Sequence, residues 1–296
     1  MTAAPAEAAA TPGQIAVAHG VAAPPAPWRL LLRKPTFLIG AAVLLFWVVC
    51  AVFGHQIAPY DPLAQNLLAK DMPPSAAHLF GIDSLGRDVL SRVITGARDI
   101  LLISPLATLL GTVLGTVTGL IMGYVGGIVD TVLSRIVEAV LALPVVIVAF
   151  LFIVAVSPSP LTLILVIGFI FTPLIARTVR TAVLVESQQD YLSSARLLGE
   201  RPRYIMFAEI LPNVLPVIVV EFTVRLGYAI FAVATLSFLG FGVQQPTPDW
   251  GGDIAANYGL LGAGYWWEVL FAALAIASLV MALNLVTDGI EQVISS

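Results

Sequence analysis

The chain has few charged residues for its length, and this scarcity decides its broad class. It contains 14 Lys and Arg and 18 Asp and Glu among 296 residues, whereas 59% of the residues belong to the set AVILMFWYC. Its mean hydropathy is +0.97. A soluble domain needs more charge to cover its surface, because charged residues are the ones most often exposed. The repeated apolar runs of about 18 residues or more instead predict an all-α membrane protein.

Several kinds of binding site are missing as well. The net charge is −4 and there is no basic tract, so the electrostatic footprint of nucleic-acid binding is absent. The single cysteine, Cys50, cannot form an internal disulfide, and it lies in an apolar run where it is expected to pack against helices or lipid. The three histidines, His19, His55 and His78, are far apart and share no spacing typical of metal ligands.

The sequence also lacks the groups that catalysis needs. Neither of the two lysines, Lys34 and Lys70, lies in the G-x-x-x-x-G-K-[ST] loop that holds nucleotide phosphates. ATP hydrolysis in a system that contains this chain therefore has to occur on another polypeptide. No Ser/His/Asp set and no pair of carboxylates stands out either. We predict no catalytic residue, no metal and no cofactor in this chain.

Six apolar runs predict six transmembrane helices. They lie at residues 36–54, 99–125, 130–156, 161–181, 212–240 and 268–288. Pro144 in the third run and Pro173 in the fourth predict kinks, because proline removes a backbone donor and clashes with the preceding turn. Residues 1–28 are rich in Ala and Pro and nearly uncharged, which predicts a disordered tail with little to bury.

The positive charges predict the orientation of the spans. Three of them precede the first span: Arg29, Arg33 and Lys34. The densest basic stretch runs from residue 177 to residue 203. Because cytoplasmic loops carry an excess of Lys and Arg, both termini and the loop at 186–211 are predicted to be cytoplasmic. The segments at 55–98 and 241–265 are then predicted to be external.

A stripe of small residues marks the second span. It consists of Gly111, Gly115, Gly119 and Gly123. Residues four apart share one helix face, and small residues there let a second helix approach closely. We therefore predict tight packing inside a helix bundle. The alternative is that these glycines are merely tolerated in an apolar helix.

Two opposite charges lie inside the fifth predicted span. Glu221 and Arg225 are four residues apart and can pair on one helix face. Charges within a membrane usually face the bundle interior or a water-filled path. One hypothesis is that the two residues line a translocation path and contact a zwitterionic peptide. The other is that they form a structural ion pair that positions the helix.

The loop between the fourth and fifth spans is amphipathic. Leu192, Ala195 and Leu198 have the spacing of one helical face. Gly199 fits a helix C′ position, where a left-handed turn is favourable. Pro202 can then begin a second short helix. A helix, a sharp turn and another helix would suit docking into a partner's groove, although a plain connector is the alternative.

This segment resembles the EAA loop of binding-protein-dependent ABC importer permeases. The residues that match at the family's spacing are Ala195, Gly199, Leu211 and Pro212. Ser193 and Ser194 depart from the pattern, since the family usually has Glu and Ala there. The resemblance implies a coupling helix that sits on a cytoplasmic ATPase subunit. The implied coupling residues are Ser193, Ser194, Ala195, Leu198, Gly199, Arg201, Leu211 and Pro212.

Other segments resemble the dipeptide, oligopeptide and nickel branch of that family. They are residues 58–62, 78–92, 236–242, 246–251 and 284–289. With a permease core at 97–290, the chain is most similar to the "C"-type partner of a heterodimeric peptide permease. This implies a type I ABC importer bundle in the bacterial cytoplasmic membrane, surrounded by lipid. The implied partners are a second homologous permease subunit, two ATPase domains that bind ATP and Mg, and an external substrate-binding protein.

The function implied by the resemblance is import of di- or oligopeptides by alternating access, without catalysis by this chain. The main alternative is a secondary transporter driven by an ion gradient. Such a protein is expected to show internal repeats and several ionisable groups near the membrane centre. We find no clear repeat and one such pair, which favours the ABC importer.

Overall fold

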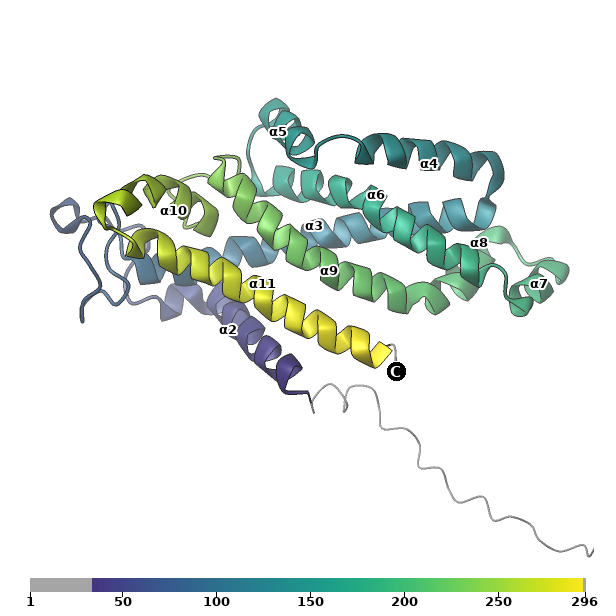
Figure 1. Cartoon of the computed structure of the whole chain (residues 1–296), viewed down its shortest axis with the longest axis horizontal. Coiled ribbons are helices and arrows are strands. Elements are labelled where there is room, and N and C mark those ends of the chain that lie inside the picture. Colours follow the sequence, from purple (N-terminus) through teal and green to yellow (C-terminus); the bar gives the residue numbers. More distant parts are fainter. Residues whose placement is uncertain (1–33, 295–296) are drawn as a thin grey trace, which may run out of the picture.

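Residues 34–294, the part of the chain that this computed structural model describes, form a bundle of long helices (Figure 1). Within this range the only β-type pairing is an isolated bridge between Ile82 and Asp88. Five helices are long and apolar enough to cross a membrane, and a bent pair of helices gives a sixth if it is counted as one span. The predicted all-α membrane fold is confirmed. The predicted disordered tail at 1–28 lies outside the described residues.

The elements follow one another through short links, apart from the long segment between the first two spans. In chain order they are α2 (Pro35–Ile57), η1 (Leu67–Ala69), α3 (Val89–Val125), α4 (Gly127–Leu141), α5 (Val145–Val156), α6 (Pro160–Glu186), α7 (Asp190–Leu197), α8 (Pro202–Tyr204), the π-helix η2 (Ile205–Ile210), α9 (Leu211–Phe238), α10 (Trp250–Asn257), η3 (Tyr258–Ala263) and α11 (Trp267–Ile294).

The long helices lie side by side along the long axis of the molecule. In Figure 1, α6, α9, α11 and α2 run beside one another, with α3 behind them and α4 alongside α6. The short helices α7 and α8 lie at one end of the bundle, and α10 lies at the other. These are called the α7 end and the α10 end below.

The third predicted span is not one continuous helix. The run at 130–156 is divided between α4 and α5, which are bent by 87° relative to each other. Pro144 is the N-cap of α5, and its backbone is extended, with φ −60° and ψ 116°. Proline lacks the N–H that would continue α4, so the kink predicted at Pro144 is a complete break.

The second span begins ten residues earlier than predicted. Helix α3 starts at Val89, inside the segment expected to be a loop, and the carboxylate of Asp88 caps it by accepting from the Ser91 amide at 2.8 Å. At about 1.5 Å per residue, its 37 residues span about 55 Å, well beyond a hydrocarbon core of about 30 Å. Its charged first turns therefore extend past the apolar layer, which is why they escaped a prediction based on hydropathy.

The glycine stripe of α3 packs against α6. A Cβ atom added to Gly115 would lie 2.7 Å from the Cβ of Ile175, and one added to Gly119 would lie 2.7 Å from the carbonyl oxygen of Ala176. Helix α6 also contributes a glycine to this contact, since a Cβ on Gly168 would lie 3.0 Å from the carbonyl oxygen of Ala107 in α3. A Cβ added to Gly111 or Gly123, at the two ends of the stripe, would also lie within 3.0 Å of an atom of α6. The two backbones therefore approach as closely as small residues allow.

Buried ion pairs hold the α10 end together. The guanidinium of Arg92 in α3 donates from Nε to Oδ2 of Asp253 in α10 at 3.0 Å, and from Nη2 to Oδ1 at 2.5 Å. Arg87, in the turn before α3, donates from Nε to Oδ2 of Asp83 at 2.7 Å. All four side chains are at least nine-tenths buried. A buried charge is tolerated only when it is paired, so these contacts fix α10 against α3.

Further hydrogen bonds extend the same cluster to α11. The hydroxyl of Ser84 donates to Oδ1 of Asn257 at 2.7 Å, and its amide donates to Oε2 of Glu268 at 3.1 Å. The indole of Trp267 donates to the carbonyl oxygen of Ile82 at 3.2 Å. The turn at 82–88 is therefore joined to both α10 and α11.

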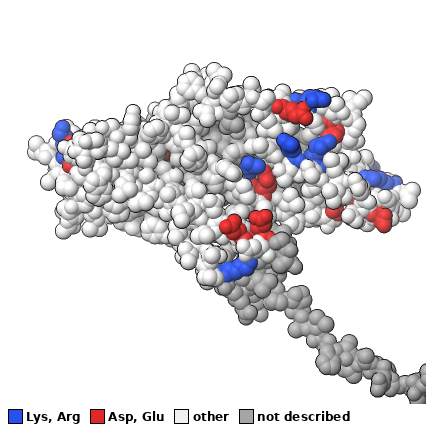
Figure 2. Space-filling view, viewed as in Figure 1, with Lys and Arg blue, Asp and Glu red and all other residues white. Residues whose placement is uncertain are grey.

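Charged side chains are unevenly distributed on the surface. On the face shown in Figure 2, Lys, Arg, Asp and Glu gather toward the α7 end, while most of the remaining surface carries no charge. Much of that uncharged surface is apolar, with exposed Leu, Val, Ile and Phe side chains on every long helix. A broad uncharged belt of this kind suits a bundle embedded in lipid.

The α3–α6 contact leads to a first prediction. Gly115→Val is expected to lower the free energy of unfolding in detergent by about 1–3 kcal/mol, because the added side chain has no room. Gly259→Ala is the control, since a Cβ there meets nothing within 4 Å. Chemical denaturation of both variants measures the difference, and equal stabilities would contradict the packing role of the stripe.

The ion pairs of the α10 end lead to a second prediction. Asp253→Ala is expected to destabilise the protein by about 3–5 kcal/mol, because it leaves the buried Arg92 unpaired. The double variant Arg92→Leu/Asp253→Leu should recover part of this loss. Glu138→Ala is the control. It breaks the exposed pair Arg135–Glu138, at 2.9 Å, and should cost less than about 1 kcal/mol. A loss for Asp253→Ala no larger than the control's would contradict this assignment.

Candidate functional site

The predicted coupling loop forms a short projection at the α7 end. Helix α7 begins at Asp190 and ends at Leu197, and Figure 1 shows it beyond the ends of α6 and α9. Gly199 has φ +77°, the left-handed conformation predicted for it. The amide of Glu200 donates to the carbonyl oxygen of Ala195 at 3.2 Å and that of Gly199 to Arg196 at 3.1 Å, the two bonds of a Schellman motif.

The two faces of α7 differ in exposure. Leu192 is fully buried, and Ala195 packs against the hydrophobic core. Leu197 and Leu198 are 89% and 82% exposed. The single face expected from Leu192, Ala195 and Leu198 is therefore split, because Leu192 anchors the helix while Leu198 points outward. Of the other predicted coupling residues, Leu211 is half-buried, and those exposed are Ser193, Ser194, Gly199, Arg201 and Pro212.

The chain returns to the bundle through a π-helix. Pro202 begins α8, as its position in the sequence predicts, and the π-helix Ile205–Ile210 then leads directly into α9. The amide of Leu211 donates to the carbonyl oxygen of Met206, five residues earlier. No sequence feature signalled this wider turn. π-helical turns are frequent at functional sites, and here one joins the predicted coupling loop to a membrane-spanning helix.

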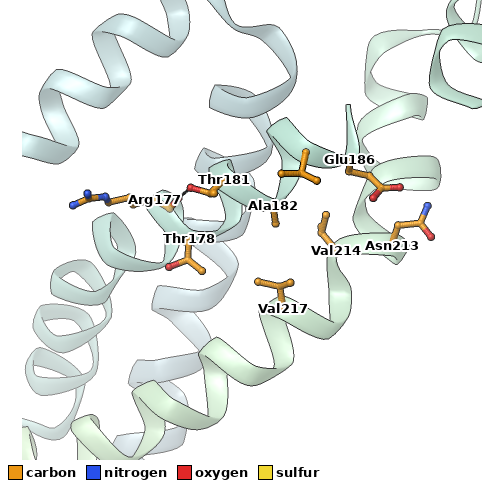
Figure 3. Close-up of a pocket in the computed structure, with 9 residues that line it drawn as sticks. Arg177, Thr178, Thr181, Ala182, Glu186, Asn213, Val214 and Val217 are labelled. Carbon is orange, nitrogen blue, oxygen red and sulfur yellow. Dashed lines mark hydrogen bonds between the residues drawn. The ribbon is translucent and has the colours of Figure 1, made fainter. Parts of the chain in front are cut away.

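A cleft of about 590 Å³ lies between α6 and α9 near the α7 end (Figure 3). Ala182, Val214 and Val217 form its apolar centre. Arg177 lies at one side, and Glu186 and Asn213 lie together at the other. Arg177 is exposed, and its guanidinium makes no ion pair with another described residue. The cleft thus carries opposite charges on either side of an apolar floor.

A hydrogen-bond bridge closes the side of the cleft nearest α7. The hydroxyl of Tyr191 donates to Oε1 of Glu186 at 2.5 Å and accepts from Nδ2 of Asn213 at 2.7 Å. Burial and the bond to Glu186 raise the pKa of Tyr191 to about 12, so the phenol stays protonated at neutral pH. Sequence reasoning missed this bridge, because Asn213 lies 22 residues after Tyr191.

The intramembrane pair lies on the same face of α9 as the cleft. Arg225 donates from Nε to Oε1 of Glu221 at 2.7 Å, and both side chains are largely buried. The guanidinium also lies 5.7 Å from the centre of the Tyr228 ring. Val217, which lines the cleft, is one turn before Glu221. The polar groups of α9 therefore continue from the cleft toward the middle of the helix.

A second ion pair between helices was not predicted. Arg180 of α6 donates to both carboxylate oxygens of Asp130 in α4, at 2.5 and 2.7 Å. Arg135, five residues after Asp130, pairs instead with Glu138 at 2.9 Å. Asp130 and Arg180 are 50 residues apart, so local spacing gave no signal. Among residues 34–294, no three His, Cys, Asp or Glu side chains are grouped as metal ligands.

The chain matches two known protein families. Residues 115–296 match the family described as the binding-protein-dependent transport system inner membrane component. Residues 27–74 match the N-terminal TM domain of oligopeptide transport permease C. The first match covers more than half of the chain and includes α6, the coupling loop and α9.

Several curated relatives are similar over most of their length. The dipeptide transport system permease protein DppC of Escherichia coli K12 is 41% identical over 270 residues, covering 89% of this chain and 90% of that protein. The DppC protein of Bacillus subtilis is 35% identical over 266 residues, covering 89% and 82%. The glutathione transport system permease protein GsiD of Salmonella typhimurium is 39% identical over 268 residues, covering 89% and 87%.

The fold has a counterpart among solved structures. A chain of the MetNI methionine ABC transporter, in an inward-facing conformation, superposes with a TM-score of 0.57 at 22% identity. The match covers 69% of this chain and 97% of that chain. It supports the helical arrangement, while the family and relatives support the class of protein. The chain therefore belongs to the family of binding-protein-dependent transport system inner membrane components, as a membrane-spanning permease subunit of an ABC importer.

Proposed function

We propose that this permease imports short peptides, and that ATP hydrolysed on a partner subunit drives it through α7. The relatives transport dipeptides or glutathione, which is itself a small peptide. Family membership favours this over transport driven by an ion gradient. In this proposal ATP and Mg bind the ATPase subunits, and the chain itself holds no cofactor.

The observation that carries the coupling proposal is the exposed apolar end of α7. The side chains of Leu197 and Leu198 are almost fully exposed, on a helix that Leu192 anchors in the core. Large exposed apolar side chains outside the membrane belt mark protein–protein contacts. A docked ATPase would cover them, and a push on the projection would reach the bundle through the buried anchor.

The distribution of arginine supports an orientation. Arg196, Arg201 and Arg203 are exposed in the α7 loop, whereas at the α10 end the segment 241–265 has no Lys or Arg, and Arg87 and Arg92 are buried in ion pairs. We infer that the α7 end is cytoplasmic and faces the ATPase. The α10 end then faces the external binding protein, and both termini are cytoplasmic.

The α6–α9 face is the proposed wall of the translocation path. It presents the cleft and, one turn further along α9, the Glu221–Arg225 pair. Charges at that depth are costly in lipid, so this face has to meet water or protein. A second, homologous permease subunit would supply the opposite wall. A short peptide with a free amino and carboxyl end fits a lining of both signs.

The proposed cycle is alternating access. Loaded binding protein docks at the α10 end, where the ion pairs make a rigid platform. Closure of the ATPase dimer displaces α7, and the α6–α9 face changes the side to which the path opens. Each ligand can shift this equilibrium only by its different affinity for the two states.

The docking role of α7 is tested by one exposed leucine. Leu198→Asp is expected to abolish co-purification with the ATPase subunits, because a charge replaces an apolar contact while the bundle is untouched. Leu68→Asp is the control, at a fully exposed leucine of η1 toward the opposite end. Co-purification that survives Leu198→Asp would overturn this docking surface.

The path role of the intramembrane pair is tested by charge removal. Arg225→Gln is expected to lower peptide uptake by about tenfold, since a hydrogen bond to a charged group contributes about 1.5–3 kcal/mol and 1.4 kcal/mol is tenfold. Assembly with the partner subunits should be normal. Normal uptake by both Arg225→Gln and Glu221→Gln would leave the pair a purely structural role.

A further inference from the structure

One hydroxyl joins the coupling helix to both walls of the cleft. Glu186 is the last residue of α6, Tyr191 is the second residue of α7, and Asn213 lies in the first turn of α9. The Tyr191 hydroxyl donates to Glu186 and accepts from Asn213, at 2.5 and 2.7 Å. Both partners line the cleft, where Figure 3 shows them next to each other. The bridge therefore connects three elements through a single atom.

The hydrogen bonds of Tyr191 to Glu186 and Asn213 can break and re-form at small cost. The amide of Asn213 also donates to the carbonyl oxygen of Glu209 at 2.9 Å, so it keeps an acceptor when Tyr191 leaves. Glu186 and Asn213 are both solvent-accessible, and water can replace the phenol on each. Neither partner becomes a buried unsatisfied group, so the contact can switch without a large penalty.

The other anchors of α7 do not reach the cleft. Leu192 is buried in the core, and the Arg196 guanidinium lies 5.4 Å from the centre of the Tyr124 ring at the end of α3. Only Tyr191 ties α7 by side-chain hydrogen bonds to α6 and α9 among the described residues. A displacement of α7 would thus be transmitted to the cleft through the Tyr191 hydroxyl.

We propose that Tyr191 is a positioning residue that converts displacement of the coupling helix into movement of α9 relative to α6. It acts through Glu186 and Asn213 and need not touch the cargo. This inference rests on the proposed function, because it presumes that an ATPase displaces α7. A continuous chain of hydrogen bonds with two arrangements is a physical route for such coupling.

The test is Tyr191→Phe, which removes only the bridging oxygen. The variant is assembled with the partner permease, the ATPase subunits and the binding protein in proteoliposomes. Peptide imported per ATP hydrolysed is expected to fall by about 5-fold or more, because the variant loses both hydrogen bonds of the phenol. Co-purification and basal ATP hydrolysis should be unchanged. Tyr204→Phe is the matched control, in the same loop, with no side-chain hydrogen bond to a described residue.

A double variant separates the bridge from a general defect. Asn213→Leu should also lower the import ratio, and Tyr191→Phe/Asn213→Leu should be no worse than Tyr191→Phe alone, because all three variants break the hydrogen bond between Tyr191 and Asn213. Additive losses would overturn the bridge as the shared route.

A distance measurement gives a second readout. Cys50→Ala provides a background free of cysteine, and spin labels at Thr181→Cys and Val217→Cys report the separation of the cleft walls. The change in that distance on ATP binding is expected with Tyr191 and is expected to be lost with Tyr191→Phe.

The outcomes distinguish the two levels of inference. If the wild-type complex never imports peptide with ATP, the proposed function fails. If it does, and Tyr191→Phe matches Tyr204→Phe in import ratio and wall distance, only the role of Tyr191 fails. Loss of co-purification in Tyr191→Phe would also overturn it, since the hydroxyl would then serve docking or folding.

Discussion

The close approach of α3 to α6 is the contact on which the rest of the bundle depends. Lipid tails are as apolar as leucine, so helices in a membrane gain little by hiding apolar surface and must gain from tight packing. Four glycines on α3 and one on α6 allow that packing along most of both helices. Helices α2, α4, α9 and α11 are then arranged around this pair. The cleft between α6 and α9 exists because α6 is held on one side and left accessible on the other.

Arginine side chains are buried at one end of the bundle and exposed at the other. At the α10 end, Arg87 and Arg92 are buried and paired, and Arg92 joins α3 to α10 while Arg87 pairs with Asp83 in the turn before α3. At the α7 end, the arginines of the loop are exposed, and α7 is held by one buried leucine, one cation–π contact and one hydroxyl. Buried pairs resist separation, whereas exposed or exchangeable contacts do not. In the proposed cycle the bundle is held at the α10 end and displaced at the α7 end, and this asymmetry fits both roles.

Sequence reasoning succeeded where the physical signal is local. Apolar runs of membrane length located the spans, and Gly199 marked the end of α7 because its left-handed turn needs no partner. It failed where the signal is distant or absent. The Asp130–Arg180 and Tyr191–Asn213 contacts join residues 50 and 22 positions apart, and Arg92 in the early part of α3 pairs with Asp253, 161 positions away. Hydropathy also could not show that Pro144 separates two helices at a steep angle.

The π-helix before α9 affects how that helix tolerates a change in chain length. Its wider turn accommodates one residue more than an α-helix of the same length would. Each residue of an α-helix corresponds to a rotation of about 100°. Loss of a single residue between 205 and 210 would restore regular winding and leave Asn213 and the stripe through Glu221 and Arg225 facing the same way, whereas a loss between Asn213 and Glu221 would turn that stripe by about 100° relative to Asn213. This short segment is therefore a place where the chain can gain or lose one residue without changing the face that α9 presents.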